Sequence, residues 1–134
     1  MAEKAEEIGI KTFPISMNGE VDPLACFRIR ISTNRFRYDI LHSHTSHAHT
    51  LAFFSSIGTN VNRLVTRRVD FSIFRHSFLK LSGIKYRYMS DFYIAISHKI
   101  KEVLVNDGIP AGRIFVVPSG INPNRFANAG KDYL

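Results

Sequence analysis

Short apolar runs alternate along this chain with longer amphipathic stretches, which is the pattern of strands that alternate with helices. The expected strands occupy residues 10–15, 38–42, 62–66, 91–96 and 114–117, and helices are expected at about 2–8, after 22, up to about 57 and up to about 108. Strands that are apolar on both faces and are joined by helices predict right-handed crossovers and a parallel sheet. We therefore expect an α/β domain of Rossmann-like type, with helices covering both faces of the sheet.

Helix boundary residues support this division of the chain. Asp22 is a good N-cap with Pro23 at the first helical position, and Ser97 caps a later helix. Gly58 is expected to end the helix before it. In the helix after Asp22, three apolar residues recur at helical spacing, while the arginines fall elsewhere: Leu24, Phe27 and Ile31, against Arg28, Arg30, Arg35 and Arg37.

In a parallel sheet of this kind the ligand crevice lies beyond the carboxyl ends of the strands. The residues at those positions are His42–His44, Thr66–Arg68, Ser97 and Pro118–Gly120. Imidazoles, guanidiniums and a helix N-terminus on one rim suit a phosphorylated or polyhydroxylated ligand. No arrangement of Ser, His and acid, and no pair of carboxylates, indicates a hydrolase there, because Asp70 is the only acid near the rim.

Composition narrows the partners and the compartment. The 134 residues suit one domain with a real core, and the formal charge of +7 favours anionic partners unless it is only a solvated basic surface. The single cysteine, Cys26, makes no internal disulfide, which fits a reducing compartment. No apolar run approaches the roughly 20 residues of a membrane helix, and the acidic opening is unlike a signal peptide. We expect a cytoplasmic protein whose membrane contact, if present, is peripheral.

Five motifs occur in a fixed order along the chain. They are Tyr38–His44 (YDILHSH), Leu64–Phe71 (LVTRRVDF), Ile94–Ser97 (IAIS), Asp107–Ile114 (DGIPAGRI) and Val116–Asn122 (VVPSGIN), with Arg125 and Phe126 after the last. In this order they resemble the acceptor-side, N-terminal domain of family 4 glycosyltransferases, which have the two-domain GT-B fold. The resemblance spans roughly residues 4–126.

The resemblance implies a transfer reaction. Members move a glycosyl unit with retention from a nucleotide sugar to an acceptor hydroxyl, without a metal or another cofactor. The acceptor would be a glycan or lipid-linked molecule, in cell-envelope polysaccharide or lipopolysaccharide synthesis at the inner face of the membrane. Residues 1–126 resemble a partial domain, and 127–134 the start of an interdomain linker or a tail. Because the first strands, the Gly-rich loop and the nucleotide-sugar domain have no counterpart here, the chain alone is expected to be inactive.

The same resemblance predicts the fate of strand 10–15. In the family order 3-2-1-4-5-6-7, the two strands without a counterpart are those that join this strand to the rest of the sheet. Segment 10–15 should therefore pair outside the family order, for instance beside strand 38–42, or be poorly ordered. Pro14 also places it near a strand end or a sheet edge.

By resemblance, His44 and Arg68 are the candidate catalytic residues, in contact with sugar or phosphate. The candidate substrate-binding residues are His42, Arg67, Ser97, Ser119 and Gly120. Four of them have a structural alternative: His42 bonded to backbone, Arg68 paired with Asp70, Ser97 as a helix cap, and Gly120 as the residue that allows a tight backbone path. The dense histidines His42, His44, His47 and His49 suggest zinc, but a strand-to-helix transition should scatter them, and we expect no metal site.

The segment from Phe71 to Met89 interleaves aromatic and basic residues. This composition fits a peripheral membrane surface or a lipid-linked acceptor site, nucleic-acid binding, or ordinary packing beneath a solvated face. It leaves one rival to a glycosyltransferase, a non-catalytic basic module that binds nucleic acid or anionic lipid.

Overall fold

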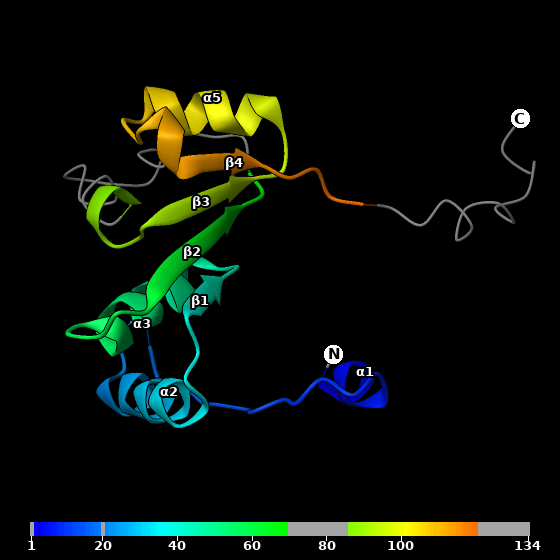
Figure 1. Cartoon of the computed structure of the whole chain (residues 1–134), viewed down its shortest axis with the longest axis vertical. Coiled ribbons are helices and arrows are strands. Elements are labelled where there is room, and N and C mark those ends of the chain that lie inside the picture. The colour runs from blue at the N-terminus through cyan, green and yellow to red at the C-terminus, as the bar shows by residue number, and fades with distance from the viewer. Residues whose placement is uncertain (1, 20, 70–85, 121–134) are drawn as a thin grey trace, which may run out of the picture.

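The computed structural model describes residues 2–19, 21–69 and 86–120. Along the chain the elements are α1 (Ala2–Glu7), α2 (Pro23–Phe36), β1 (Ile40–Ser43), α3 (Ser46–Ser56), β2 (Asn62–Arg67), β3 (Phe92–Ala95), α5 (His98–Asn106), the short 3-10 helix η1 (Ala111–Arg113) and β4 (Ile114–Val116). Figure 1 shows the strands between α5 at one end and α2 at the other.

The four strands form a single parallel sheet in the order β1-β2-β3-β4. The register pairs His42 with Leu64, Thr66 with Ile94, and Ala95 with Val116. Each strand thus lies beside the next one along the chain, and a helix or a longer connection joins each pair. This confirms the expected α/β fold with a parallel sheet and flanking helices.

The helix ends lie where the boundary residues predict them. The carboxylate of Asp22 accepts hydrogen bonds from the backbone N–H of Leu24 (2.9 Å) and Ala25 (3.0 Å), and also from that of Asn18 (2.9 Å). These backbone hydrogen bonds hold the pKa of Asp22 below its ordinary value, and the bond from Ala25 has the largest effect. Gly58 has a φ of +71°, a conformation that glycine adopts without steric cost, and it ends the turn after α3.

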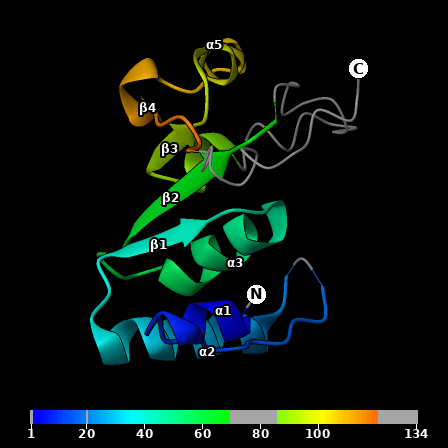
Figure 2. The ribbon, with the colours of Figure 1, turned by 90° about the vertical axis from the view of Figure 1, so that its right-hand side faces the viewer.

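One face of the sheet is covered by helices. Val65, Tyr93 and Ala95 pack against residues of α5, with Ile100 and Leu104 among the buried members. A second buried cluster joins α2 to α3 through Ala25, Cys26 and Leu51. Figure 2 shows the resulting stack, with α3 between β1 and α2.

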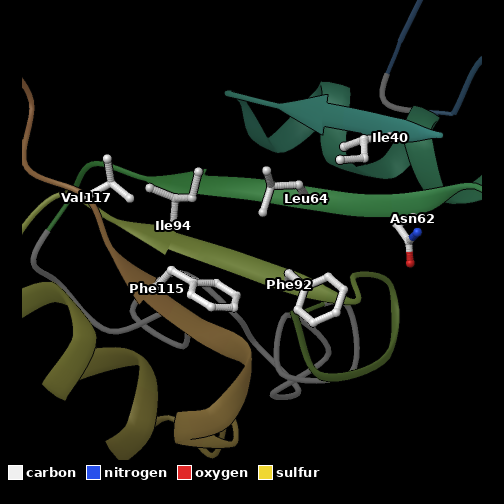
Figure 3. Close-up of a pocket in the computed structure, with 7 residues that line it drawn as sticks. All are labelled: Ile40, Asn62, Leu64, Phe92, Ile94, Phe115 and Val117. Atoms are coloured by element: carbon white, nitrogen blue, oxygen red, sulfur yellow. The ribbon is translucent and has the colours of Figure 1, made fainter. Parts of the chain in front are cut away.

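The opposite face carries apolar side chains that no described helix covers. They line an open hollow and lie together in Figure 3: Ile40, Leu64, Phe92, Ile94, Phe115 and Val117, beside Asn62. Ile40, Phe115 and Val117 are each more than half exposed. The expectation of helices on both faces is therefore wrong for the described residues. Right-handed crossovers between successive neighbours place all their helices on the same side.

Residues 10–15 are not a strand, so that part of the prediction is wrong. They are irregular and lie against α2, where the ring centroids of Phe13 and Phe36 are 5.4 Å apart. Ile15 packs on the cluster between α2 and α3. Within the described ranges no segment occupies the free edge of β1, and residues 10–15 do not pair beside it.

The described helices are all too short or too polar to cross a bilayer. Most of the aromatic and basic segment between Phe71 and Met89 lies outside the described residues, which resume at Tyr86.

Candidate functional site

The predicted site residues follow the carboxyl ends of neighbouring strands. His44 comes directly after β1, Arg68 directly after β2, and Ser97 shortly after β3. Because all four strands run parallel, these ends meet at one edge of the sheet, toward which the strand arrows point in Figure 1. We call this edge the strand-end rim and define it by His42, His44, Thr66, Arg68 and Ser97.

The centre of the rim is a contact between β1 and β2. Nε2 of His42 lies 2.7 Å from the hydroxyl oxygen of Thr66, and the ring centroid of His44 is 4.2 Å from that of His42. His42 and Thr66 both belong to the face of the sheet that the described helices leave open. His42 therefore bonds to a side-chain hydroxyl on the next strand. The structural alternative, in which this histidine bonds to a backbone group, is not what the structure has.

The surroundings of His42 favour its neutral form. Partial burial lowers the pKa of the imidazole below 6.5, and the charges of His44 and Arg68 lower it further. A neutral imidazole has one donor and one acceptor nitrogen, which suits hydrogen bonding with sugar hydroxyls.

The two arginines at the end of β2 are separated by the alternation of the strand. Arg67 points to the helix-covered face, where Nη1 donates to the hydroxyl of Tyr86 (3.0 Å) and the guanidinium carbon lies 5.4 Å from the centre of that ring. Arg68 is exposed at the rim. The structure thus brings Arg68, but not Arg67, to the histidines. The alternative partner of Arg68, Asp70, lies outside the described residues.

Ser97 is the N-cap of α5, as predicted. Its hydroxyl accepts a hydrogen bond from the backbone N–H of Ile100 (3.3 Å). Ser119 and Gly120 are exposed beyond β4. A Cβ added to Gly120 would meet no described atom within 4 Å, and its φ is not in the left-handed region. Among the described residues, therefore, no contact and no left-handed φ calls for a glycine at position 120.

Of the four clustered histidines, His42 and His44 stay together at the rim, whereas His47 and His49 lie on α3. His49 is 1% exposed, and its Nε2 lies 2.6 Å from Oγ of Ser90. His47 is exposed on α3. Across residues 2–19, 21–69 and 86–120 no group of three potential ligands stands close enough together to hold a metal ion.

Two residues of these contacts, Thr66 and Ser90, were not among the predicted catalytic or substrate-binding residues. Thr66 stands near the end of an expected strand. Because Leu64 pairs with His42 across the sheet, and Thr66 lies two residues later on the same face, strand alternation could have marked Thr66 as a neighbour of His42. Ser90 has no such signal, because its contact with His49 spans 41 residues of chain.

Comparison with known proteins agrees with this fold. The sequence profile described as Glycosyltransferase Family 4 matches residues 2–125. The crystal structure of a glycosyltransferase from Rickettsia africae ESF-5 is similar, with a TM-score of 0.68 and 19% identity. That match covers 96% of this chain and 34% of the other, so the chain spans about a third of that protein's length. No curated protein sequence matches the chain significantly.

Proposed function

This chain belongs to glycosyltransferase family 4, and from that membership we propose that its strand-end rim is the acceptor-side wall of a sugar-transfer cleft. The reaction is transfer of a glycosyl unit from a nucleotide sugar to an acceptor hydroxyl, with retention. The opposite wall, which holds the nucleotide, belongs to a second domain, and the chain without it is inactive.

The observation that carries the proposal is the close contact of His42 and His44 at the end of β1, beside the end of the neighbouring strand β2 where Arg68 is exposed. His42 is bonded to Thr66. The ring of the neighbouring His44 is exposed and can contact a ligand. Arg68 supplies a permanent planar charge that binds phosphate or steadies the charge that develops on the leaving diphosphate. The part of Arg68 is therefore charge stabilisation and not proton transfer.

The remaining predicted residues support this wall to different degrees. Ser97 presents the N-terminus of α5 beside the rim, while Ser119 and Gly120 follow the last strand at the side of the interdomain crevice. Arg67 donates a hydrogen bond to Tyr86 on the helix-covered face and does not contact the substrate. The acceptor is a glycan or lipid-linked molecule of cell-envelope synthesis, met at the inner face of the membrane.

The test is an NMR titration of the chain with short glycans and, separately, with nucleotide sugars. We expect glycan-induced shifts at His42, His44 and Arg68, and much weaker effects from the nucleotide sugar because its main binding wall is elsewhere. Arg68→Ala should abolish the glycan shifts. Shifts spread over all exposed arginines, Arg87 and Arg113 included, would contradict the assignment.

Arg67 and Arg68 form a matched pair for an activity test. In a polypeptide that carries this segment together with a nucleotide-sugar domain, Arg68→Ala should lower kcat by roughly 100-fold, as removal of a charge-stabilising donor does, with little loss of stability. Arg67→Ala should reduce stability first, because it removes the contacts with Tyr86. Full activity in Arg68→Ala would return Arg68 to a structural role.

The rival function, a basic module that binds nucleic acid, differs in its salt dependence. Nucleic-acid binding through many phosphates weakens steeply as salt is added. An acceptor wall should bind labelled single-stranded DNA only at background level. Tight, salt-sensitive DNA binding that is lost in Arg68→Ala would favour the rival.

A further inference from the structure

The side-chain hydroxyl of Thr66 is buried and has one partner. Thr66 is 9% exposed, and its Oγ1 lies 2.7 Å from Nε2 of His42. In the part of the chain that the structure describes, this hydroxyl makes no other hydrogen bond. The imidazole is therefore the group that must satisfy it.

The hydroxyl proton decides the direction of this hydrogen bond. If Nε2 of His42 donated to Oγ1, the proton of the Thr66 hydroxyl would find no acceptor among the described residues. Buried polar groups are almost always hydrogen-bonded, because an unsatisfied donor loses its bond to water and gains nothing in return. Donation from the hydroxyl to Nε2 satisfies both groups.

The direction of the bond fixes where the ring carries its own proton. Partial burial holds the pKa of His42 below 6.5, so the ring is neutral at physiological pH. A neutral imidazole has one protonated nitrogen, and the bond made by one nitrogen determines the state of the other. Since Nε2 accepts from Thr66, the proton lies on Nδ1. His42 is exposed, and its Nδ1 has no hydrogen-bond partner among the described residues.

We propose that Thr66 is a positioning residue that makes His42 present Nδ1–H, a hydrogen-bond donor, to a ligand at the strand-end rim. The ligand atom that this donor recognises is an acceptor oxygen, from a sugar or from a phosphate group. A ligand group that can only donate, such as an ammonium, is disfavoured at this position. The identity of the ligand rests on the proposed function, whereas the tautomer of His42 does not.

The tautomer is measured on the full chain by long-range proton–nitrogen NMR with labelled histidine, without ligand and well above pH 6.5. We expect the proton of His42 on Nδ1. Thr66→Val keeps the branched shape but removes the hydroxyl, so the ring should shift toward Nε2–H, the form that neutral histidine favours in water. Thr66→Ser retains a hydroxyl and should keep the proton on Nδ1. A proton on Nε2 in the unmodified chain would overturn the proposal.

Thr33 offers a matched control for the loss of a buried hydroxyl. It is 4% exposed, and its hydroxyl donates to the carbonyl of Ile29 within α2 (2.8 Å). Thr33→Val should leave the tautomer of His42 unchanged. If Thr66→Val also leaves it unchanged, Thr66 has only a structural role and the proposal is overturned. If Thr66→Val does not fold, the unmodified chain and Thr66→Ser decide the tautomer by themselves.

The ligand is tested with short neutral glycans and, separately, with inorganic phosphate. Thr66→Val should weaken glycan binding about fivefold, the effect of losing one hydrogen bond between neutral groups. Thr66→Ser and Thr33→Val should bind like the unmodified chain. If only phosphate shifts the Nδ1 resonance of His42, the recognised oxygen belongs to a phosphate group.

Two results separate a failure of this inference from a failure of the proposed function. If the glycans bind Thr66→Val as tightly as the unmodified chain, the donor role of His42 is overturned, although the rim still binds glycan. If neither glycan nor phosphate affects the unmodified chain, the proposed function fails together with the donor role. The tautomer measurement contains no ligand, so it still decides whether Thr66 positions the ring.

Discussion

Nε2 of His42 on β1 and the hydroxyl oxygen of Thr66 on β2 lie 2.7 Å apart. The contact joins two strands whose carboxyl ends form the rim, and it orients a histidine whose ring centroid lies 4.2 Å from that of His44. Because the partner is a hydroxyl on a rigid strand, the ring is held in place before any ligand arrives.

The first prediction concerns the titration of His42. Its pKa lies below 6.5 because of partial burial and, secondarily, the charges of His44 and Arg68. The folded chain then binds fewer protons than the unfolded chain in this range. The contribution of His42 to stability is present above pH 6.5 and is lost as the pH falls through the folded-state pKa.

NMR titration of the imidazole measures this directly. Arg68→Gln should move the midpoint of His42 upward, while Arg87→Gln, far from β1 in sequence, should leave it unchanged. An Arg68→Gln variant with the original midpoint would show that the guanidinium does not act on the histidine pair.

The second prediction concerns the pair Arg63 and Asp91, which ties β2 to the start of β3. Nε and Nη2 of Arg63 donate to the two carboxylate oxygens of Asp91 at 2.9 and 2.7 Å, and the backbone N–H of Arg63 donates to the same group. These bonds hold the pKa of Asp91 below its ordinary 3.8. Asp91→Ala should lower the free energy of unfolding by about 1–3 kcal/mol at neutral pH.

The pH dependence gives this prediction its control. The stabilisation is present above pH 3.8 and disappears as the pH falls through the folded-state pKa. Urea unfolding of the two proteins should therefore converge in strong acid. A deficit that stays constant with pH would mean that packing, and not the ionised pair, is lost in Asp91→Ala.

The third prediction concerns the buried contact between His49 and Ser90. Ser90 is 2% exposed, and its hydroxyl lies 2.6 Å from Nε2 of His49. Ser90→Ala leaves a buried imidazole nitrogen without this partner and should cost about 1–3 kcal/mol. The exposed Ser119→Ala should stay within about 0.5 kcal/mol of the unmodified chain in the same denaturation experiment.

The fourth prediction compares the two faces of the sheet. Leu104→Ala removes a fully buried side chain beneath the covered face and should destabilise by about 2–5 kcal/mol. Phe115→Ser changes an exposed residue on the open face and should alter stability by less than about 0.5 kcal/mol. It should also reduce light scattering on heating, because exposed apolar patches promote association. A large destabilisation by Phe115→Ser would mean that this face is covered after all.

Local chemistry could be recognised without coordinates. Asp22 and Ser97 cap helices as predicted, and Gly58 adopts the left-handed conformation that ends a helix. These features depend on hydrogen bonds within a few residues, so the sequence contains both partners. The parallel order of the strands was predictable as well, because helical connections between apolar strands allow few topologies.

Long-range packing was not predictable in the same way. The regular spacing of Leu24, Phe27 and Ile31 shows that they share a face of α2, but only the contact with α3 determines that this face is the outer one. Similarly, Arg67 and Arg68 are adjacent in the chain, and the pleat of β2 sends them to opposite sides.

By itself, then, the sequence determined the helix ends, four of the five expected strands and the set of residues at their carboxyl ends, since these follow from neighbouring residues and from chain connectivity. Tertiary structure decided which members of that set meet, which apolar faces stay open, and where residues 10–15 lie. The reason is physical: burial is a property of what packs on a surface, and the partners that bury His49 or expose Phe115 come from distant parts of the chain.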